Sequence, residues 1–533
     1  MQIRRGLNSS IEFIKAFGFI LFIMVMFLML TLTVAFSQSV AGLKLIEIGQ
    51  PQKGVEALRK AAEQDPSPAN YFNLGTGLLQ TGNLNDALAA FEKGGNDPMN
   101  LVGKGRVALR QNNLQAANAN FDKAIQQTKS KNTQVLNAVA EAWLDKREFA
   151  AKAKAVLEKS EGIEQTFKAS MLLGDVYLLE GNGGQAISNY EHAAMLDVRN
   201  AAPHYRIGNV YVRSTNKDAA IESFQKAVNV DPGYAPAYKE LAELYYMMKN
   251  GPEAAKAQEK YMELSESGEN GNVRMGYYQF MNRDFAKAND AFGKAYQGGT
   301  LKDNALRYYA LSLVEAGDLA ESQRIFEQYF SKAKPEQIDA SDYAQYGKVL
   351  LKLEQDSLAV AAFENSLAID SKQVPLRQLQ AETLYKDKRY AESVAAYKQL
   401  IGLRAKPSSQ DLYSLGRAYY YNENFQQSDS TFRKLIDLQP TMTVGYLWAG
   451  RSNAQLDPDT EKGLAKPFYE KLIEIGQATA DKSRGDLKEA YSYLGYYYFV
   501  KNNAAMSRAN WEKVLAIDPQ DERAKEALKA IKQ

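Results

Sequence analysis

A repeat of 34 residues constrains this chain more than any other feature of its sequence. In five successive units a small residue stands at the same point, at Gly174, Gly208, Ala242, Gly276 and Ala310. A fixed period of this length is typical of architectures in which one short structural unit is stacked many times. The chain is therefore expected to form a stacked array, in which each unit buries its core only against its neighbours.

The register extends to fourteen repeats, and every one has Gly or Ala at the first small position. A second small residue follows twelve positions later in all repeats except the fourth, which has Lys152, provided that three residues are inserted in the thirteenth. Four residues further on, eleven repeats have an aromatic residue: Phe91, Phe121, Tyr190, Phe224, Phe292, Phe326, Phe363, Tyr397, Phe432, Tyr469 and Trp511.

Apolar residues recur at three- and four-residue spacing within each unit, which predicts two helices. The helices are expected to be joined near Gly, Asn or Asp, as in "EAGD" at 315–318 and "YNEN" at 421–424. The two small residues let the helices cross closely, and the aromatic ring is expected to fill the gap against the next unit. A proline such as Pro232 or Pro440 would end the second helix.

This pattern resembles the tetratricopeptide repeat (TPR) family over residues 38–520. The resemblance implies an all-α fold, a right-handed α-solenoid of about fourteen TPR helix pairs with a C-terminal capping helix. The predicted parts are repeats 1–3 at 38–133, a degenerate repeat 4 at 134–167, repeats 5–14 at 168–520 and the capping helix at 521–533.

Two departures from the pattern lead to separate expectations. Repeat 4 has Ala140, Lys152 and Val156 at its three key positions, which predicts a softer joint in the array. Repeat 13 has extra residues around "LDPDTEKG" (456–463) and "GQATADKSRGD" (476–486), and these are either contact loops or simple loop growth.

Residues 1–37 are interpreted as a signal peptide or an N-terminal membrane anchor. Arg4, Arg5 and Lys15 precede a stretch without charge from 16 to 43, and the small residue Ser37 offers a cleavage site. The apolar run is also long enough to span a bilayer. Its basic start favours a cytoplasmic N-terminus. The repeats are then expected in the periplasm of a Gram-negative bacterium, soluble after cleavage or anchored to the inner membrane.

The sequence gives little sign of catalytic chemistry. It has no Cys and only two His, so disulfides and Cys-ligated zinc are excluded. A formal net charge of +2 provides no basic field for nucleic acid. Asp145 and Glu148, in "WLDKREF" at 143–149, are interpreted as solvated turn residues. We therefore predict no enzyme, no cofactor and no metal.

The resemblance implies that the first helix of each unit lines a concave groove that binds partners. Counted from the small residue, the groove positions mix aromatic rings with Arg and Lys, and Tyr and Arg are enriched at binding hot spots. Some of the rings would equally serve to pack neighbouring helices. The candidate groove residues are Tyr246, Tyr277, Phe280, Lys348, Tyr385, Arg417, Tyr420, Arg451, Tyr496 and Phe499.

The favoured hypothesis is a non-enzymatic scaffold in the cell envelope that binds partner proteins or peptides in this groove. Long TPR proteins of this kind resemble components of secretion, assembly or TonB-type energy-transduction complexes. The alternative is a membrane-anchored receptor or holdase for extended peptides or precursor proteins. An uncleaved segment 1–37 would favour the alternative.

Overall fold

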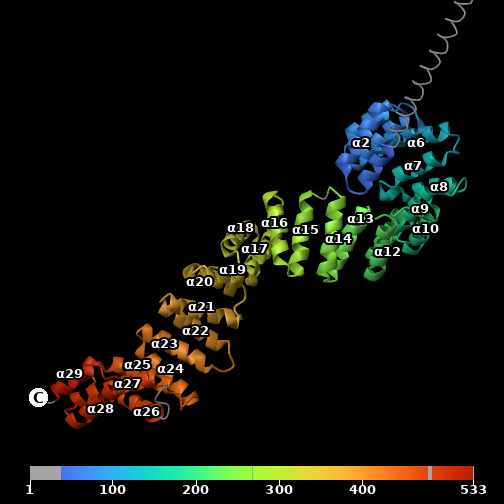
Figure 1. Ribbon diagram of the computed structural model, residues 1–533. Coiled ribbons are helices and arrows are strands. Elements are labelled where there is room, and N and C mark those ends of the chain that lie inside the picture. The colour runs from blue at the N-terminus through green and yellow to red at the C-terminus, as the bar shows by residue number, and fades with distance from the viewer. Residues whose placement is uncertain (1–37, 267, 478–482, 532–533) are drawn as a thin grey trace, which may run out of the picture. The chain divides into compact units, whose positions relative to one another are not determined.

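The computed structural model describes residues 38–266, 268–477 and 483–531, and all regular structure in these residues is helical. Residues 38–47 and the helices α2 to α28 form fourteen successive pairs (Figure 1). The predicted all-α solenoid fold is therefore confirmed. The predicted signal or anchor segment, residues 1–37, lies outside the described residues.

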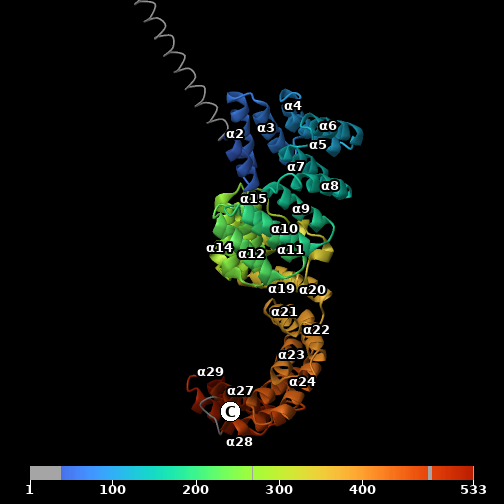
Figure 2. The same cartoon turned by 90° about the vertical axis from the view of Figure 1, so that its right-hand side faces the viewer.

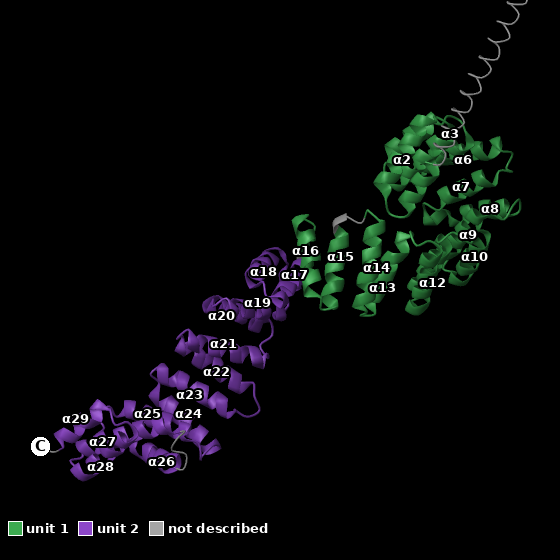
Figure 3. Cartoon of the chain, viewed as in Figure 1, with its two compact units in different colours: residues 1–305 green, residues 306–533 purple. Residues whose placement is uncertain are grey.

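The chain divides into two compact units at residues 305 and 306, which we call unit 1 and unit 2 (Figure 3). The helices of unit 1 are α2 (Pro51–Gln64), α3 (Pro68–Gln80), α4 (Leu84–Lys93), α5 (Pro98–Arg110), α6 (Leu114–Gln127), α7 (Thr133–Trp143), η1 (Arg147–Phe149), α8 (Ala150–Glu161), α9 (Phe167–Leu179), α10 (Gly183–Leu196), α11 (Ala202–Arg213), α12 (Lys217–Val230), α13 (Ala235–Met247), α14 (Gly251–Leu264), α15 (Gly268–Met281) and α16 (Phe285–Gln297).

Unit 2 begins within α17, which spans the division. Its helices are α17 (Asp303–Ala316), α18 (Leu319–Lys332), η2 (Pro335–Gln337), α19 (Ala340–Lys352), α20 (Asp356–Ile369), α21 (Val374–Lys386), α22 (Tyr390–Gly402), α23 (Ser409–Tyr421), α24 (Phe425–Leu438), α25 (Thr443–Leu456), α26 (Lys466–Gly476), α27 (Arg484–Val500), α28 (Ala504–Ile517) and α29 (Glu522–Ala530).

The spacing of small and aromatic residues that recurs from repeat to repeat has a direct packing cause. A Cβ added at Gly208 would lie 2.5 Å from the ring of Phe224, because the ring of the second helix packs directly on the first helix of its own repeat. Phe91 also reaches the next repeat, since a Cβ at either Gly75 or Gly103 would approach its ring to 2.4 Å. The ring thus packs both within its own helix pair and against the next repeat. The sequence predicted only the contact with the next repeat.

The second small position differs in chemistry between the units. In unit 1 it is mostly Ala, for example Ala186 and Ala220, both fully buried. In unit 2 it is often Ser, and the hydroxyl of Ser393 donates to the carbonyl oxygen of Ala381 at 2.9 Å. Three further serines make the same bond to the carbonyl twelve residues before them: Ser322, Ser428 and Ser507. These residues therefore tie the two helices together as well as letting them approach.

Repeat 4 shares a continuous core with its neighbours, although its three key positions depart from the pattern. A single core cluster runs from Leu101 to Val176 through both helices of this repeat. Trp143 takes over the filling role of the missing aromatic residue, with its ring 5.0 Å from that of Phe121. The ammonium of Lys152 lies 4.4 Å from the Trp143 ring, an arrangement that stabilises a cation next to an aromatic face. The division between the units lies at 305/306.

Unit 1 also closes on itself through a contact that the sequence did not predict. The start of α2 lies against the segment between α14 and α15, more than two hundred residues away (Figure 2). Gln50 donates to the carbonyl of Leu264 at 2.7 Å, and the backbone N–H of Glu266 donates to the carbonyl of Gly49 at 2.9 Å. The carboxylate of Glu266 accepts from the backbone N–H of Gln52, so it caps α2 from a distant repeat.

The C-terminal helix α29 covers the last repeat of unit 2. Asp521 caps it by accepting from the backbone N–H of Ala524 at 3.0 Å. Ala524 is fully buried in a small core with Trp511 and Val514 of α28. The apolar end of the array is thereby covered by a helix with a charged outer side.

Candidate functional site

Side chains from the first helices of neighbouring repeats meet along one side of each unit, which we call the first-helix face. In unit 2 the centre of this face is α23. Its residues Tyr413, Arg417, Tyr420 and Tyr421 are four, three and one residues apart, so they form one stripe along the helix. This stripe meets rings from the first helices of the repeats before and after it.

Arg417 lies at the middle of a group of aromatic rings. Its guanidinium carbon is 5.0 Å from the ring centre of Tyr385 on α21, and 5.4 Å from those of Tyr413 and of Trp448 on α25. Cation–ring contacts at this distance are attractive, and more so where water is excluded. We call the rings around Arg417 the aromatic cluster: Tyr385, Tyr390, Tyr413, Tyr420, Tyr421 and Trp448.

The aromatic cluster is held in place by its own ring contacts. The rings of Tyr420 and Trp448 meet edge to face at 5.3 Å, and those of Tyr390 and Tyr421 stack at 5.4 Å. Trp448 also stacks on the buried Phe432 at 5.8 Å, which anchors the cluster to the core. Such offset and edge contacts fix ring positions as well as adding stability. The surface around Arg417 is therefore pre-organised.

The charge of Arg417 is not neutralised by any carboxylate in the described part of the chain. Its Nε is buried and has no hydrogen-bond partner there. Its polar contacts are with tyrosine hydroxyls, Nη1 to that of Tyr413 at 3.5 Å and a further contact with that of Tyr421. Burial raises the pKa of Tyr385 to about 12, so the phenol beside the guanidinium stays protonated at neutral pH. Arg417 thus keeps hydrogen-bond donors available for an external acceptor.

Arg451, in contrast, already has a carboxylate partner. Its Nε and Nη2 donate to the two carboxylate oxygens of Glu489 on α27, at 2.8 and 2.7 Å. Glu489 also accepts from the hydroxyl of Tyr469 at 3.0 Å. The sequence placed Arg451 beside Arg417 as an equal candidate, but the geometry gives Arg451 a structural pairing between neighbouring first helices.

The remaining candidates of unit 2 are accessible but do not join the aromatic cluster by any ring contact that the structure shows. Tyr496 and Phe499 on α27 are 39% and 48% exposed. Lys348 on α19 is exposed and forms no ion pair with the described residues. The structure therefore brings Tyr385, Arg417 and Tyr420 together, with Arg451 next to them over the ring of Trp448.

In unit 1 the candidate rings take part in packing. Tyr277 lies edge to face on the buried Phe292 of its own repeat at 5.5 Å, and Phe280 lies 5.6 Å from Phe285. Tyr246 is 38% exposed, with its ring 5.2 Å from that of Tyr278. These contacts match the alternative interpretation, in which rings of the face pack neighbouring helices.

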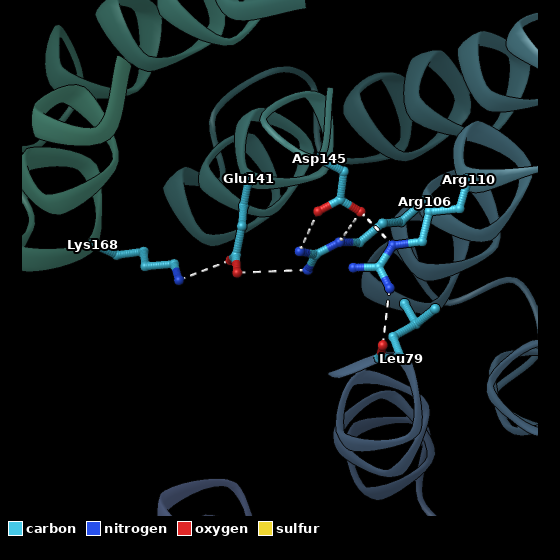
Figure 4. A network of polar contacts seen from close by, with 6 residues as sticks. All are labelled: Leu79, Arg106, Arg110, Glu141, Asp145 and Lys168. Carbon is cyan, nitrogen blue, oxygen red and sulfur yellow. Dashed lines mark hydrogen bonds and ion pairs between the residues drawn. The ribbon is translucent and has the colours of Figure 1, made fainter. Parts of the chain in front are cut away.

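The first-helix face of unit 1 carries a network of ion pairs instead (Figure 4). Asp145 on the turn after α7 accepts from Arg106 Nη2 at 2.8 Å and from Arg110 Nε at 2.7 Å. Glu141 bridges Arg106 at 3.5 Å and Lys168 at 2.8 Å, so the network links α5, α7 and α9. The side chain of Asp145 is only 12% exposed. The interpretation of Asp145 as a solvated turn residue was therefore wrong, while Glu148 is exposed.

Four members of the aromatic cluster were not among the predicted groove residues. Tyr413 and Tyr421 lie one turn before and after Arg417, Trp448 belongs to the next repeat, and Tyr390 is the first residue of the second helix α22. Extending the count by one helical turn on each side of Arg417 would have found both tyrosines, because they share its stripe. Trp448 gave no such signal, since its contact with Arg417 depends on how two repeats pack.

The described residues show no arrangement typical of catalysis. Among residues 38–266, 268–477 and 483–531, no group of three or more His, Asp or Glu could hold a metal ion. His192 contacts the hydroxyl of Ser170 at 3.0 Å through Nδ1 and packs within repeat 5. In the same part of the chain, no helix combines the length and the apolar character needed to cross a bilayer.

Comparison with known proteins agrees with this architecture. Models of the tetratricopeptide repeat match residues 40–98, 201–234 and 412–442. The C-terminal part of a TPR repeat-containing protein from Cytophaga hutchinsonii is 32% identical, over 48% of this chain and 99% of that chain, with a TM-score of 0.38. The chain thus belongs to the tetratricopeptide repeat family, whose members generally bind proteins or peptides and generally have no catalytic role.

Two further solved structures that resemble the chain have lower sequence identity. A tetratricopeptide repeat protein from Parabacteroides merdae is 15% identical, over 50% of this chain and 98% of that chain, with a TM-score of 0.28. YrrB, described as a TPR protein with an unusual peptide-binding site, is 18% identical, over 36% of this chain and 92% of that chain, with a TM-score of 0.29. No match was found among the curated proteins.

Proposed function

We propose that the chain is a non-catalytic scaffold that binds an extended peptide segment of a partner protein on the first-helix face of unit 2. The single observation that carries this proposal is Arg417, a half-buried cation that is surrounded by rings and has no carboxylate partner among the described residues. A carboxylate of the partner would supply the missing acceptor. Apolar side chains next to that carboxylate would cover Tyr420 and Tyr421.

The free energy of hydrogen bonding at Arg417 favours the binding of an external carboxylate. A guanidinium offers five N–H donors, and hydrogen bonds to charged groups contribute about 1.5–3 kcal/mol each. The rings around Arg417 lower the local dielectric, which strengthens such a bond. Because the rings already contact one another, the side-chain entropy lost on binding would be small.

The proposal is tested by measuring which partner proteins still bind when the side chains of Arg417 and Tyr420 are removed. The double variant Arg417→Ala and Tyr420→Ala, in the full chain, is expected to lose the proteins that wild-type chain captures by crosslinking in the cell. Lys398→Ala, an exposed cation on the second helix α22, serves as the matched control and should keep them. Unchanged partners in the double variant, with unchanged helicity, would reject the first-helix face of unit 2 as the binding site.

We also propose that the scaffold acts in the cell envelope, as part of a secretion, assembly or TonB-type energy-transduction complex. The support is the basic start followed by the apolar run in residues 1–37. The mass of the protein from cells is expected to correspond to a chain that begins at Gln38. A full-length chain in the membrane fraction, together with crosslinks to many unfolded precursors, would favour the membrane-anchored receptor or holdase instead.

A further inference from the structure

The first insertion of repeat 13, at 456–463, has a defined structure that forms one wall of a cavity, whereas residues 478–482 of the second insertion lie outside the described residues. The carboxylate of the buried Asp457 accepts from the backbone N–H groups of Lys462 at 3.1 Å, Gly463 at 2.6 Å and Leu464 at 3.3 Å. The loop is also tied to α27, because Lys501 donates to the carbonyl of Glu461 at 2.6 Å. The loop is therefore held in a defined shape on both sides.

Gly463 shows how tightly the loop is fixed. Its φ is +70°, a conformation that favours glycine, and an added Cβ would lie 2.5 Å from the ring of Tyr497 on α27. Thr460 has a φ of +60° in the same loop and is buried. A loop held in this way keeps its shape before any ligand arrives, which lowers the entropic cost of binding.

The cavity beside this loop has a volume of about 550 Å³. That size lies within the range of roughly 300–1,000 Å³ that is usual for ligand sites. Its lining comes from α24, α25, the insertion and α26, and includes Arg433, Tyr446, Lys462, Leu464, Phe468 and Lys471. Three of these side chains are cations, none is an acid, and the others are two rings and one aliphatic group.

The three cations of the cavity can still bind a carboxylate, although two of them already contact acidic residues of the protein. Arg433 uses its Nε for Asp429 at 2.8 Å, and its guanidinium lies 4.5 Å from the ring of Phe468. Lys471 pairs with the exposed Glu474, and such surface pairs are weak and readily exchanged. Lys462 is exposed, with no ion pair to the described residues. The backbone donors of the loop are already taken by Asp457, so recognition would rest on these side chains.

We propose that this cavity is a second binding site, for an acidic peptide segment in which carboxylates alternate with apolar side chains. Carboxylates would pair with Arg433, Lys462 and Lys471, and the apolar side chains would lie on Tyr446, Leu464 and Phe468. A bare inorganic anion would use only the cations and leave the apolar part of the lining without a partner. This site and the aromatic cluster share no side chain, so each proposal can be tested without the other.

The test uses the full chain and a fluorescein-labelled peptide of alternating Glu and Leu, followed by fluorescence polarisation at fixed ionic strength. The double variant Lys462→Glu and Lys471→Glu is expected to bind this peptide at least about tenfold more weakly, because two charge-assisted contacts become repulsive. The matched control, Lys434→Glu with Lys513→Glu, makes the same change in net charge at exposed sites outside the cavity and should bind as wild type.

Three results would overturn the proposal. One is equal binding by the cavity variant and wild type, and another is an equal loss in the matched control, which would mean attraction by net charge alone. The third is complete displacement of the peptide by inorganic phosphate at low millimolar concentration. The cavity variant and its control are also compared in an Arg417→Ala background, so that the aromatic cluster does not contribute to binding of the peptide. A photoreactive version of the peptide should label residues 462–471, and labelling confined to α21 and α23 would assign the binding to the aromatic cluster instead.

Discussion

The first-helix faces of the two units each hold a partly buried arginine, but they surround its charge with different groups. In unit 1 the half-buried cation Arg106 is paired with Asp145 and Glu141, so its charge is used within the protein. In unit 2 the half-buried cation Arg417 is surrounded by rings and has no carboxylate partner in the described residues. A neutralised cation stabilises the joint between repeats, whereas a cation held only by rings remains able to bind an external carboxylate. The partner of each arginine, rather than its position in the repeat, thus separates structural from binding roles.

The largest expected effect comes from breaking the network of unit 1. Asp145→Ala leaves Arg106 and Arg110 without their shared carboxylate, and removing one member of a largely buried ion pair costs about 3 kcal/mol. Hydrogen exchange should show faster opening of α5 and α7, while the helices of unit 2 exchange as in wild type, because repeat arrays need not unfold as one cooperative unit. Equal exchange in α5 and α7 would show that the network contributes nothing to the joint.

The same network predicts a pH dependence of the packing between α5 and α7. Burial raises the pKa of Asp145, but hydrogen bonds from Arg106 and Arg110 outweigh this effect and lower it. The ionised carboxylate therefore adds stability above its unfolded pKa of about 3.9, and this stability is lost as the pH falls through the lower pKa of the folded protein. Wild type and Asp145→Asn should differ in the stability of unit 1 near neutral pH and converge in acid.

A variant of Arg417 serves as the comparison for the pH dependence of Asp145→Asn. Arg417 has no carboxylate partner among the described residues, so the difference in stability between wild type and Arg417→Gln should stay constant over the same pH range. A difference that shrinks in acid would reveal an acidic partner of Arg417 and would remove the contrast between the two faces.

The comparison can be sharpened by giving unit 2 the chemistry of unit 1. Tyr385→Glu places a carboxylate next to Arg417, where it would compete with the carboxylate of a partner peptide. Tyr385→Gln has nearly the same size without the charge and serves as the matched control. Binding by the Glu variant should be about tenfold weaker than binding by the Gln variant, as expected for one charge-assisted contact of about 1.4 kcal/mol. Equal binding by both would show that Arg417 does not contact the ligand.

The repeat register predicted the fold almost completely, because each small and aromatic position acts within one helix pair or against the next one. Gly208 and Phe224 could be paired from their spacing alone. The pairing of Arg451 with Glu489 could not, since it joins two repeats that differ in length through the insertion. Contacts of still longer range, such as that of Gln50 with Leu264, depend on how many repeats complete a turn. The sequence thus predicted which residues lie on the first-helix face, but not which residues they contact in other repeats.

The smallest expected effect concerns the second small position, where the units differ by one hydroxyl. Ser393→Ala removes the bond to the carbonyl of Ala381 from a fully buried site, and an intramolecular hydrogen bond of this kind contributes about 1 kcal/mol. The reverse change in unit 1, Ala220→Ser, places a hydroxyl at the equivalent distance from the carbonyl of Gly208, so it should be neutral or slightly stabilising. Chemical denaturation of each variant measures both effects. A loss for Ala220→Ser as large as that for Ser393→Ala would mean that the helices of unit 1 cross too closely for a hydroxyl, and that the two units differ in helix spacing as well as in polar contacts.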